Sequence, residues 1–176
     1  MNAQVSSLDA VSVSVLPPVA RLNLRVDPDD LAAASRAFGV PIPAKVGQGA
    51  IKGGRAAYCL GPDEWLLHAP EDEQAAITAA FDTLRVTTPN SLTVISDREI
   101  TIEIRGPRAA ELLSVGCPLD LARIAPGSAK RTVFDSAQIV LLRDSKDAFR
   151  IEVWRSFFPH VHTLLQIATR ELASGL

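Results

Sequence analysis

The sequence predicts an α+β fold made of two similar strand–helix–hairpin–helix halves, with helices packed on a largely antiparallel sheet. The strongest observation is a change of hydrophobic period within residues 96–120. Ile100, Ile102 and Ile104 alternate with polar residues, which is typical of a strand. After Gly106-Pro107 the apolar residues recur at near-helical spacing. The same order of elements occurs earlier in the chain, which indicates an internal duplication.

The first half begins with alternating apolar residues and continues into a short helix. Pro28 and the acidic residues around it predict a helix start, because carboxylates are stabilised at the positive end of a helix dipole. Gly61-Pro62-Asp63-Glu64 predicts a four-residue turn between two apolar runs. The expected elements are a strand at 21–26, a helix at 31–38, a hairpin of 56–60 and 65–69, and a helix at 71–84.

The second half follows the same order and ends in a longer helix. Its expected elements are two strands within 91–105, a helix at 107–115, an irregular linker at 119–127, a hairpin from 130–143 and 149–153, and a helix at 157–172. Phe157, Val161 and Leu165 fall on one apolar stripe of that last helix. The alternation in the central strand predicts that Ile102→Asp destabilises the fold severely. Thr101→Asp, on the opposite face, should cost less stability.

The chain ahead of these halves is expected to form an N-terminal arm of residues 1–19. Val11, Val13 and Val15 alternate in it, so the arm could add as an edge strand either to this protein or to a partner. Residues 20–176 are then expected to form a single domain, with halves of about 20–90 and 91–176.

Composition excludes several classes of protein. A formal net charge of −2 and an aromatic content of 5% argue against a nucleic-acid partner. No apolar run approaches the length of a membrane span, and the N-terminus does not resemble a signal peptide. Cys59 and Cys117 each lie in or beside an apolar segment, which favours buried free thiols. We therefore expect a cytoplasmic location.

No motif predicts a catalytic, cofactor or metal site. The stretch 46–55 is rich in glycine but lacks the third glycine of a dinucleotide fingerprint, and a strand rather than a helix follows it. We expect a hairpin loop there. His160 and His162 point in different directions on a helix, and no cysteine or carboxylate stands at ligand spacing. Ser114 and Cys117 lack a neighbouring base in the sequence.

Because no catalytic motif is present, the candidate site residues are ones that could contact a partner. Trp65 follows the hairpin turn, and Trp154-Arg155 ends the last strand. Tryptophan and arginine at strand ends often anchor interfaces. The alternative is that Trp65 belongs to the core and that Arg155 caps a helix end or pairs with Glu152. With Val11, Val13 and Val15 of the arm, these residues make up the predicted partner surface.

Four stretches resemble the gamma subunit family of heterotetrameric sarcosine oxidase over most of residues 20–172. They are LGPDEWLL at 60–67, SDREITIEIRGPRAAELLSVGCPLDL at 96–121, PGSAKRTVF at 126–134 and VWRSFFPHVHTLL at 153–165. The resemblance implies a fold like the folate-binding domain of the glycine-cleavage aminomethyltransferase. It also implies partners, namely the alpha, beta and delta subunits of a complex that demethylates sarcosine to glycine and forms hydrogen peroxide and methylenetetrahydrofolate.

For this chain the resemblance implies a structural subunit without a cofactor. FAD, FMN, NAD, zinc and tetrahydrofolate are implied for the other subunits. The segment KGGRAAYCLGPDEW departs from the folate-dependent pattern, because its cysteine follows the aromatic residue and Pro-Asp-Glu stands where Gln-Glu is expected after Gly61. Two alternatives stay open. One is a stand-alone folate-binding or one-carbon protein, and the other is a gamma-like subunit of a related N-methyl amine demethylase.

Overall fold

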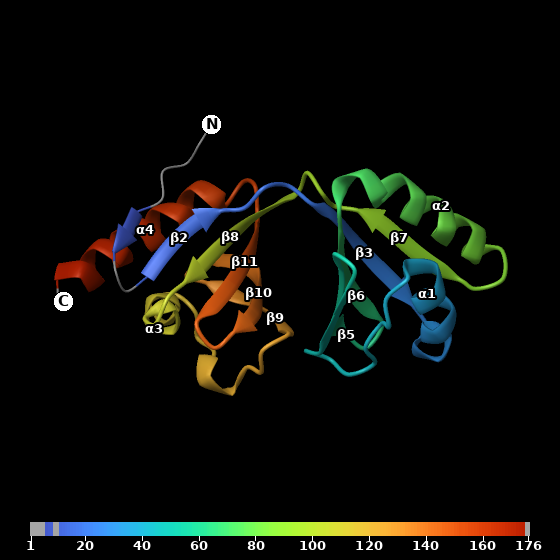
Figure 1. Cartoon of the computed structure of the whole chain (residues 1–176), viewed down its shortest axis with the longest axis horizontal. Helices are drawn as coiled ribbons and strands as arrows, with labels where there is room; N and C mark the ends of the chain where they lie inside the picture. Colours follow the sequence, from blue (N-terminus) through green and yellow to red (C-terminus); the bar gives the residue numbers. More distant parts are fainter. Residues whose placement is uncertain (1–5, 9–10, 175–176) are drawn as a thin grey trace. The chain divides into compact units, whose positions relative to one another are not determined.

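The computed structural model describes residues 6–8 and 11–174, which form two compact units. The continuous unit is Pro18–Ser96, and the discontinuous unit combines Met1–Pro17 with Asp97–Leu176. Each unit has its own antiparallel sheet, its own helices and its own apolar core (Figure 1). The predicted α+β class with two related halves is confirmed.

The continuous unit is a five-stranded sheet in the order β4-β5-β6-β3-β7. Its elements are β3 (Ala20–Val26), η1 (Pro28–Asp30), α1 (Leu31–Phe38), β4 (Gly49–Lys52), β5 (Arg55–Gly61), β6 (Glu64–Ala69), η2 (Glu71–Glu73), α2 (Gln74–Arg85) and β7 (Asn90–Val94). The core joins one face of the sheet to both helices, with Leu24, Trp65, Phe38 and Phe81 at its centre. Gly53 and Gly54 have positive φ and form the tight turn of the β4–β5 hairpin.

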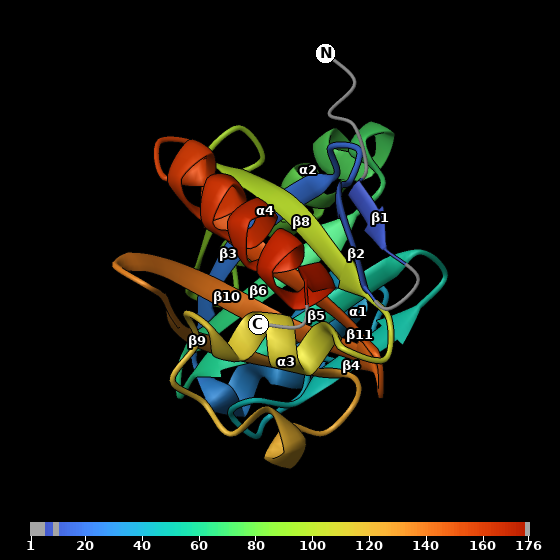
Figure 2. The ribbon, with the colours of Figure 1, turned by 90° about the vertical axis from the view of Figure 1, so that its left-hand side faces the viewer.

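The discontinuous unit is a six-stranded sheet in the order β1-β2-β8-β11-β10-β9. Its elements are β1 (Ser6–Leu8), β2 (Val11–Val15), β8 (Glu99–Arg105), α3 (Ala109–Ser114), η3 (Leu121–Arg123), β9 (Ser128–Phe134), β10 (Ala137–Ser145), β11 (Ala148–Trp154) and α4 (Phe158–Ser174). Helices α3 and α4 lie together against one face of this sheet (Figure 2).

The two sheets have the same topology, which explains the repeated sequence pattern. β8, α3, β9, β10, β11 and α4 correspond in order to β3, α1, β4, β5, β6 and α2. The strand beside β3 is β7, which follows α2, whereas the corresponding strand beside β8 is β2, from the N-terminus. Each of these strands therefore leads directly into the first strand of the other unit.

This exchange of strands corrects the expected boundaries. Residues 11–15 do not form an arm separate from the fold, because β2 pairs with β8 from Ser12 opposite Arg105 to Val15 opposite Ile102. β7 was expected to open the second half, but it pairs with β3 in the continuous unit. The division between the units therefore falls between Ser96 and Asp97. Residues 1–5 and 9–10 of the expected arm lie outside the described residues.

The first part of strand β8 is buried on both faces, although Glu103 is half-buried and Arg105 is exposed, and this corrects the expectation for Thr101. Ile102 and Ile104 are fully buried in the core, as the alternation predicts. Thr101 is only 3% exposed, and its hydroxyl donates to both carboxylate oxygens of Glu152 on β11, at 3.1 and 3.0 Å. The alternation of apolar and polar residues therefore identified the apolar face correctly. It did not show that the polar face is also buried at Thr101.

An arginine holds the irregular segment between α3 and β9. The Arg143 guanidinium on β10 donates to the carbonyls of Leu121 at 2.8 Å and Ile124 at 2.6 Å. It also lies 5.2 Å from the centroid of the Phe149 ring. Apart from the short helix η3, this segment has no regular structure, and one side chain supplies donors to its carbonyl groups at several points.

Candidate partner-binding surface

Three of the predicted interface side chains are part of the cores. Val11 and Val13 are 2% and 3% exposed and pack in the core of the discontinuous unit, while Val15 beside them is partly buried. Trp65 is fully buried in the other core, and its indole Nε1–H donates to the Pro43 carbonyl at 2.7 Å. These findings correct the prediction for the arm and for Trp65, because their side chains already pack against this chain.

Trp154 and Arg155 lie on the surface, at the end of β11. Trp154 is 42% exposed, and the Arg98 guanidinium lies 5.4 Å from the centroid of its ring. Arg155 is exposed, with its Nε donating to the Asp97 carbonyl at 2.9 Å and its backbone N–H donating to the Arg98 carbonyl at 2.8 Å. These two hydrogen bonds join the end of β11 to residues 97 and 98, so the backbone is held in place where the Trp154 and Arg155 side chains reach the surface.

Phe157 extends this surface, although the sequence pattern assigned it to the apolar stripe of the last helix. The helix begins one residue later, at Phe158, so Phe157 stands in the turn and is 43% exposed. Its backbone N–H donates to the Trp154 carbonyl at 2.9 Å, which sets the two aromatic residues on one turn. Phe158 packs against the core instead. We call Arg98, Trp154, Arg155 and Phe157 the Trp154 surface.

The Trp154 surface contains residue types that are common in protein interfaces. Tryptophan and arginine are the residue types that most often carry binding energy when a partner covers them. A cation stacked on an exposed indole gains strength when the pair is desolvated. None of the four side chains of this surface is a nucleophile with a base beside it.

His160 lies in a polar cluster at the β9–β10 turn. Its Nε2 is 2.8 Å from the Asp135 carboxylate, and the Ser136 hydroxyl donates to the same carboxylate oxygen at 3.0 Å. The His160 contact holds the pKa of Asp135 below its ordinary value. A serine–histidine–aspartate relay needs the acid and the serine on different ring nitrogens. Here Ser136 and Asp135 both face Nε2, so the cluster joins a turn to a helix and does not have the geometry of such a relay.

The remaining histidine and cysteine candidates have structural surroundings. His162 stacks on the Phe158 ring at 5.1 Å, and burial lowers its pKa. Cys59 and Cys117 are buried free thiols, and burial raises the pKa of Cys59, whose Sγ donates to the Gly61 carbonyl at 3.1 Å. Within residues 6–8 and 11–174 there is no group of three potential metal ligands. No helix in the described part of the chain is long and apolar enough to span a membrane.

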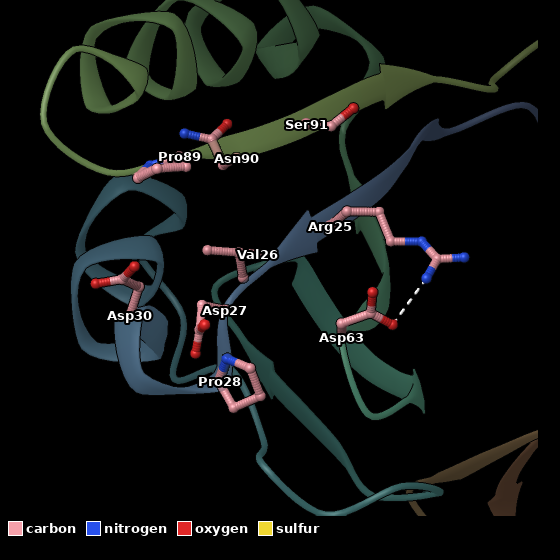
Figure 3. A pocket seen from close by; sticks show the side chains of 9 residues that line it. All are labelled: Arg25, Val26, Asp27, Pro28, Asp30, Asp63, Pro89, Asn90 and Ser91. Carbon is pink, nitrogen blue, oxygen red and sulfur yellow. Dashed lines mark hydrogen bonds and ion pairs between the residues drawn. The ribbon is translucent and has the colours of Figure 1, made fainter.

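The described chain has an open depression in the continuous unit, with a volume of about 600 Å³ (Figure 3). It lies where β3 ends, β7 begins and the β5–β6 turn approaches them. Its lining includes Asp27, Asp30 and Asp63, and the last of these pairs with Arg25 at 2.8 Å. These residues are far apart in the chain and carry no motif, so the sequence pattern did not indicate them as a site.

The fold places this chain in a known structural class. The glycine cleavage system aminomethyltransferase T from Bartonella henselae superposes with a TM-score of 0.67 over 87% of this chain and 44% of that chain, at 12% identity. The chain therefore has an aminomethyltransferase-like α+β fold.

The family follows from closer relatives. The model of the sarcosine oxidase, gamma subunit family matches residues 24–171. Sarcosine oxidase subunit gamma from Corynebacterium sp. (strain U-96) is 33% identical over 172 residues, covering 93% of this chain and 82% of that protein. The subunit gamma from Arthrobacter sp. is 31% identical, and the match covers 98% of this chain and 86% of that protein. The chain belongs to the sarcosine oxidase gamma subunit family.

The solved structures agree. A chain of the heterotetrameric sarcosine oxidase from Corynebacterium sp. U-96, in complex with pyrrole 2-carboxylate, superposes with a TM-score of 0.80 at 31% identity. The superposition covers 94% of this chain and 87% of that chain.

Proposed function

We propose that this chain is the gamma subunit of a heterotetrameric sarcosine oxidase and that it serves the complex as a structural, non-catalytic subunit. The observation that carries the proposal is the superposition, at 31% identity over 94% of this chain, on a chain from an enzyme of that composition. Its partners are then the alpha, beta and delta subunits. The complex oxidatively demethylates sarcosine to glycine, forming hydrogen peroxide and methylenetetrahydrofolate.

FAD, FMN, NAD, zinc and tetrahydrofolate belong, in this proposal, to the other subunits. The residues of this chain that most resemble such sites do not fit those groups. The glycine-rich stretch is a hairpin, with Gly53 and Gly54 between two strands, and not a loop opening a helix that would receive a pyrophosphate. In the stretch that departs from the folate-dependent pattern, Cys59 and Trp65 are fully buried. No step of the reaction is assigned to this chain.

The Trp154 surface supports the proposal as the place where another subunit binds. It combines two exposed aromatic residues with a stacked arginine on a backbone held by hydrogen bonds. Exposed tryptophan is costly to leave in water, and covering it by a partner removes that cost. The two alternatives, a stand-alone folate binder and a subunit of a related demethylase, are favoured by no observation in this structure.

Co-expression with the other subunits from the same organism tests the proposal. A tagged form of this chain should retain the three other subunits through purification, and the purified complex should release hydrogen peroxide when sarcosine is added. Retention of none of them would overturn the proposal. Peroxide release with another N-methyl amine but not with sarcosine would show that the complex is a related demethylase.

Variants of the Trp154 surface test the contact itself. Trp154→Ala with Phe157→Ala should weaken assembly by about 30-fold or more, since truncating an interface hot spot costs about 2 kcal/mol or more. Val115→Ala is the matched control, because Val115 lies in the same unit and is 60% exposed. Both variants should melt within a few degrees of the natural chain. Equal assembly of the two variants would show that the Trp154 surface is not a contact.

A further inference from the structure

Strand β7 is an edge of the sheet of the continuous unit, and one side of its backbone faces outward. Within the described residues β7 pairs with β3 alone. The Ile95 N–H donates to the Arg21 carbonyl. This bond shows which residues of β7 direct their peptide groups toward β3. Residues alternate between the partner strand and the open side in antiparallel pairing, so the peptide groups of Leu92 and Val94 face outward. These groups can pair with one further strand.

β7 also lacks the features that protect other edges in this chain. Edge strands are usually shielded by charged side chains, proline or short length. β9 carries Lys130 and Arg131, and β4 spans four residues that end in Lys52. β7 reads NSLTV, without a charge or a proline, and Val94 in it is 43% exposed. A strand of this kind is favoured where another chain covers it in the assembled state.

The other unit shows that this fold accepts a strand at the corresponding position. β2 occupies the place in the six-stranded sheet that β7 occupies in the five-stranded sheet. β1 adds antiparallel to the outer side of β2, with Ser6 opposite Val13 and Leu8 opposite Val11. Nothing in the described chain does the same for β7. The two units therefore differ by one strand, at the same edge.

Charge indicates which kind of segment fits this edge. The depression of about 600 Å³ begins at the start of β7, where Asn90 and Ser91 form part of its wall (Figure 3). Asp27, Asp30 and Asp63 contribute carboxylates to its lining, and Asp63 forms an ion pair with Arg25. The lining therefore has an excess of negative charge. A segment lying along β7 reaches the depression with one of its ends, where a lysine or arginine complements the carboxylates.

We propose that β7 receives an extended, basic segment of another subunit, which adds as a sixth strand and places a lysine or arginine in the depression lined by Asp27 and Asp30. The proposal rests on the proposed function, because the segment comes from a subunit of the same complex. Main-chain hydrogen bonds to Leu92 and Val94 supply the binding, and the acidic depression sets the direction and the register of the segment.

Hydrogen exchange measured on the isolated chain and on the assembled complex tests the proposal directly. The amides of Leu92 and Val94 should exchange at least about tenfold more slowly in the complex, because only there are they hydrogen-bonded. The amide of Ile95, which is already bonded to Arg21, should change little and is the internal control. Unchanged exchange at Leu92 and Val94 in a complex that does contain this chain would overturn the proposal while leaving the proposed function intact.

Two substitutions of Val94 distinguish the contribution of its backbone N–H to assembly from that of its side chain. Val94→Pro removes an outward N–H but no hydrogen bond to β3, so the chain should still fold while assembly weakens by about tenfold or more. Val94→Thr keeps the N–H and the branched shape, and it should assemble within about twofold of the natural chain. Equal assembly of the two variants would exclude strand addition at β7.

The acidic depression is tested by charge removal. Asp30→Asn should preserve the start of α1, because the Asp30 side chain makes no capping hydrogen bond and asparagine is a good N-cap residue. It should weaken assembly by about threefold at low salt and by less at high salt. A loss that does not depend on salt would exclude a basic partner. Slow exchange of β7 in the isolated chain, together with dimers in sedimentation, would identify a second copy as the occupant and overturn the proposal.

Discussion

Replacing Thr101 by aspartate should destabilise the chain strongly, although the sequence pattern places Thr101 on the polar face of β8. The Thr101 hydroxyl lies 3.0 and 3.1 Å from the two carboxylate oxygens of Glu152, and both residues are buried. An aspartate here would bring a second carboxylate to the first in surroundings of low dielectric. At about 3 Å and an effective dielectric constant of about 20, the repulsion of two charges is about 5 kcal/mol.

Protonation limits this cost. Two carboxylates in one site commonly share a proton, which raises the pKa of one of them. Holding a carboxyl of ordinary pKa about 3.9 protonated at pH 7 requires about 4 kcal/mol. Thr101→Asp should therefore lower the free energy of unfolding by about 4 kcal/mol at pH 7. The folded pKa of the pair is raised, so the loss shrinks as the pH falls toward about 4, where the unfolded chain also binds the proton.

Urea unfolding of Thr101→Asp and Thr101→Asn at pH 7 and at pH 4.5 measures this effect. Asparagine has nearly the same shape and can donate to Glu152, so it should cost about 1 kcal/mol at both pH values. Ile102→Asp should be severe at pH 7 as well, because it also removes the burial of an isoleucine side chain, worth about 2 to 5 kcal/mol. If the free energies of unfolding of Thr101→Asp and Thr101→Asn differ by less than about 1 kcal/mol at pH 7, the two carboxylates do not repel each other as inferred.

Three further predictions concern stability and thiol chemistry. Arg143→Lys should lower the free energy of unfolding by about 2 kcal/mol in a denaturant titration, because an ammonium group cannot reproduce the guanidinium bonds to several carbonyls. Cys59 and Cys117 should both react with a thiol reagent after denaturation and Cys59 only slowly before it, whereas a disulfide between them would contradict this. Burial holds the folded pKa of His162 below its ordinary value of 6.5, so stability should fall as the pH drops below 6.5. His162→Phe should show a smaller fall over the same pH range in thermal melts, and an unchanged fall would assign the effect to other groups.

The sequence by itself determined the local structure of this protein. The alternation around Ile102 and the change of period at Gly106-Pro107 are properties of neighbouring residues, and both appear in the structure where they were predicted. The turn after Gly61 is also present, but it is shorter than the predicted four residues, because Gly61 and Glu64 pair with each other and belong to the strands. The repeated order of elements was also visible, because each unit must bury one apolar face of a sheet beneath helices. The stretches that resemble the gamma subunit family are likewise local signals, and the family model confirms them.

Only the tertiary structure decided which strands pair and what covers them. A valine pattern such as that of β2 shows that a strand has an apolar face, but its pairing with β8 depends on contacts distant in the chain. The same reason explains why Trp65 was as plausible on the surface as in the core, and why Phe157 emerges beside Trp154. Thr101 shows the limit most directly. Its polarity indicated a separate face of the strand, whereas its burial depends on Glu152, from a strand that the sequence could not place beside it.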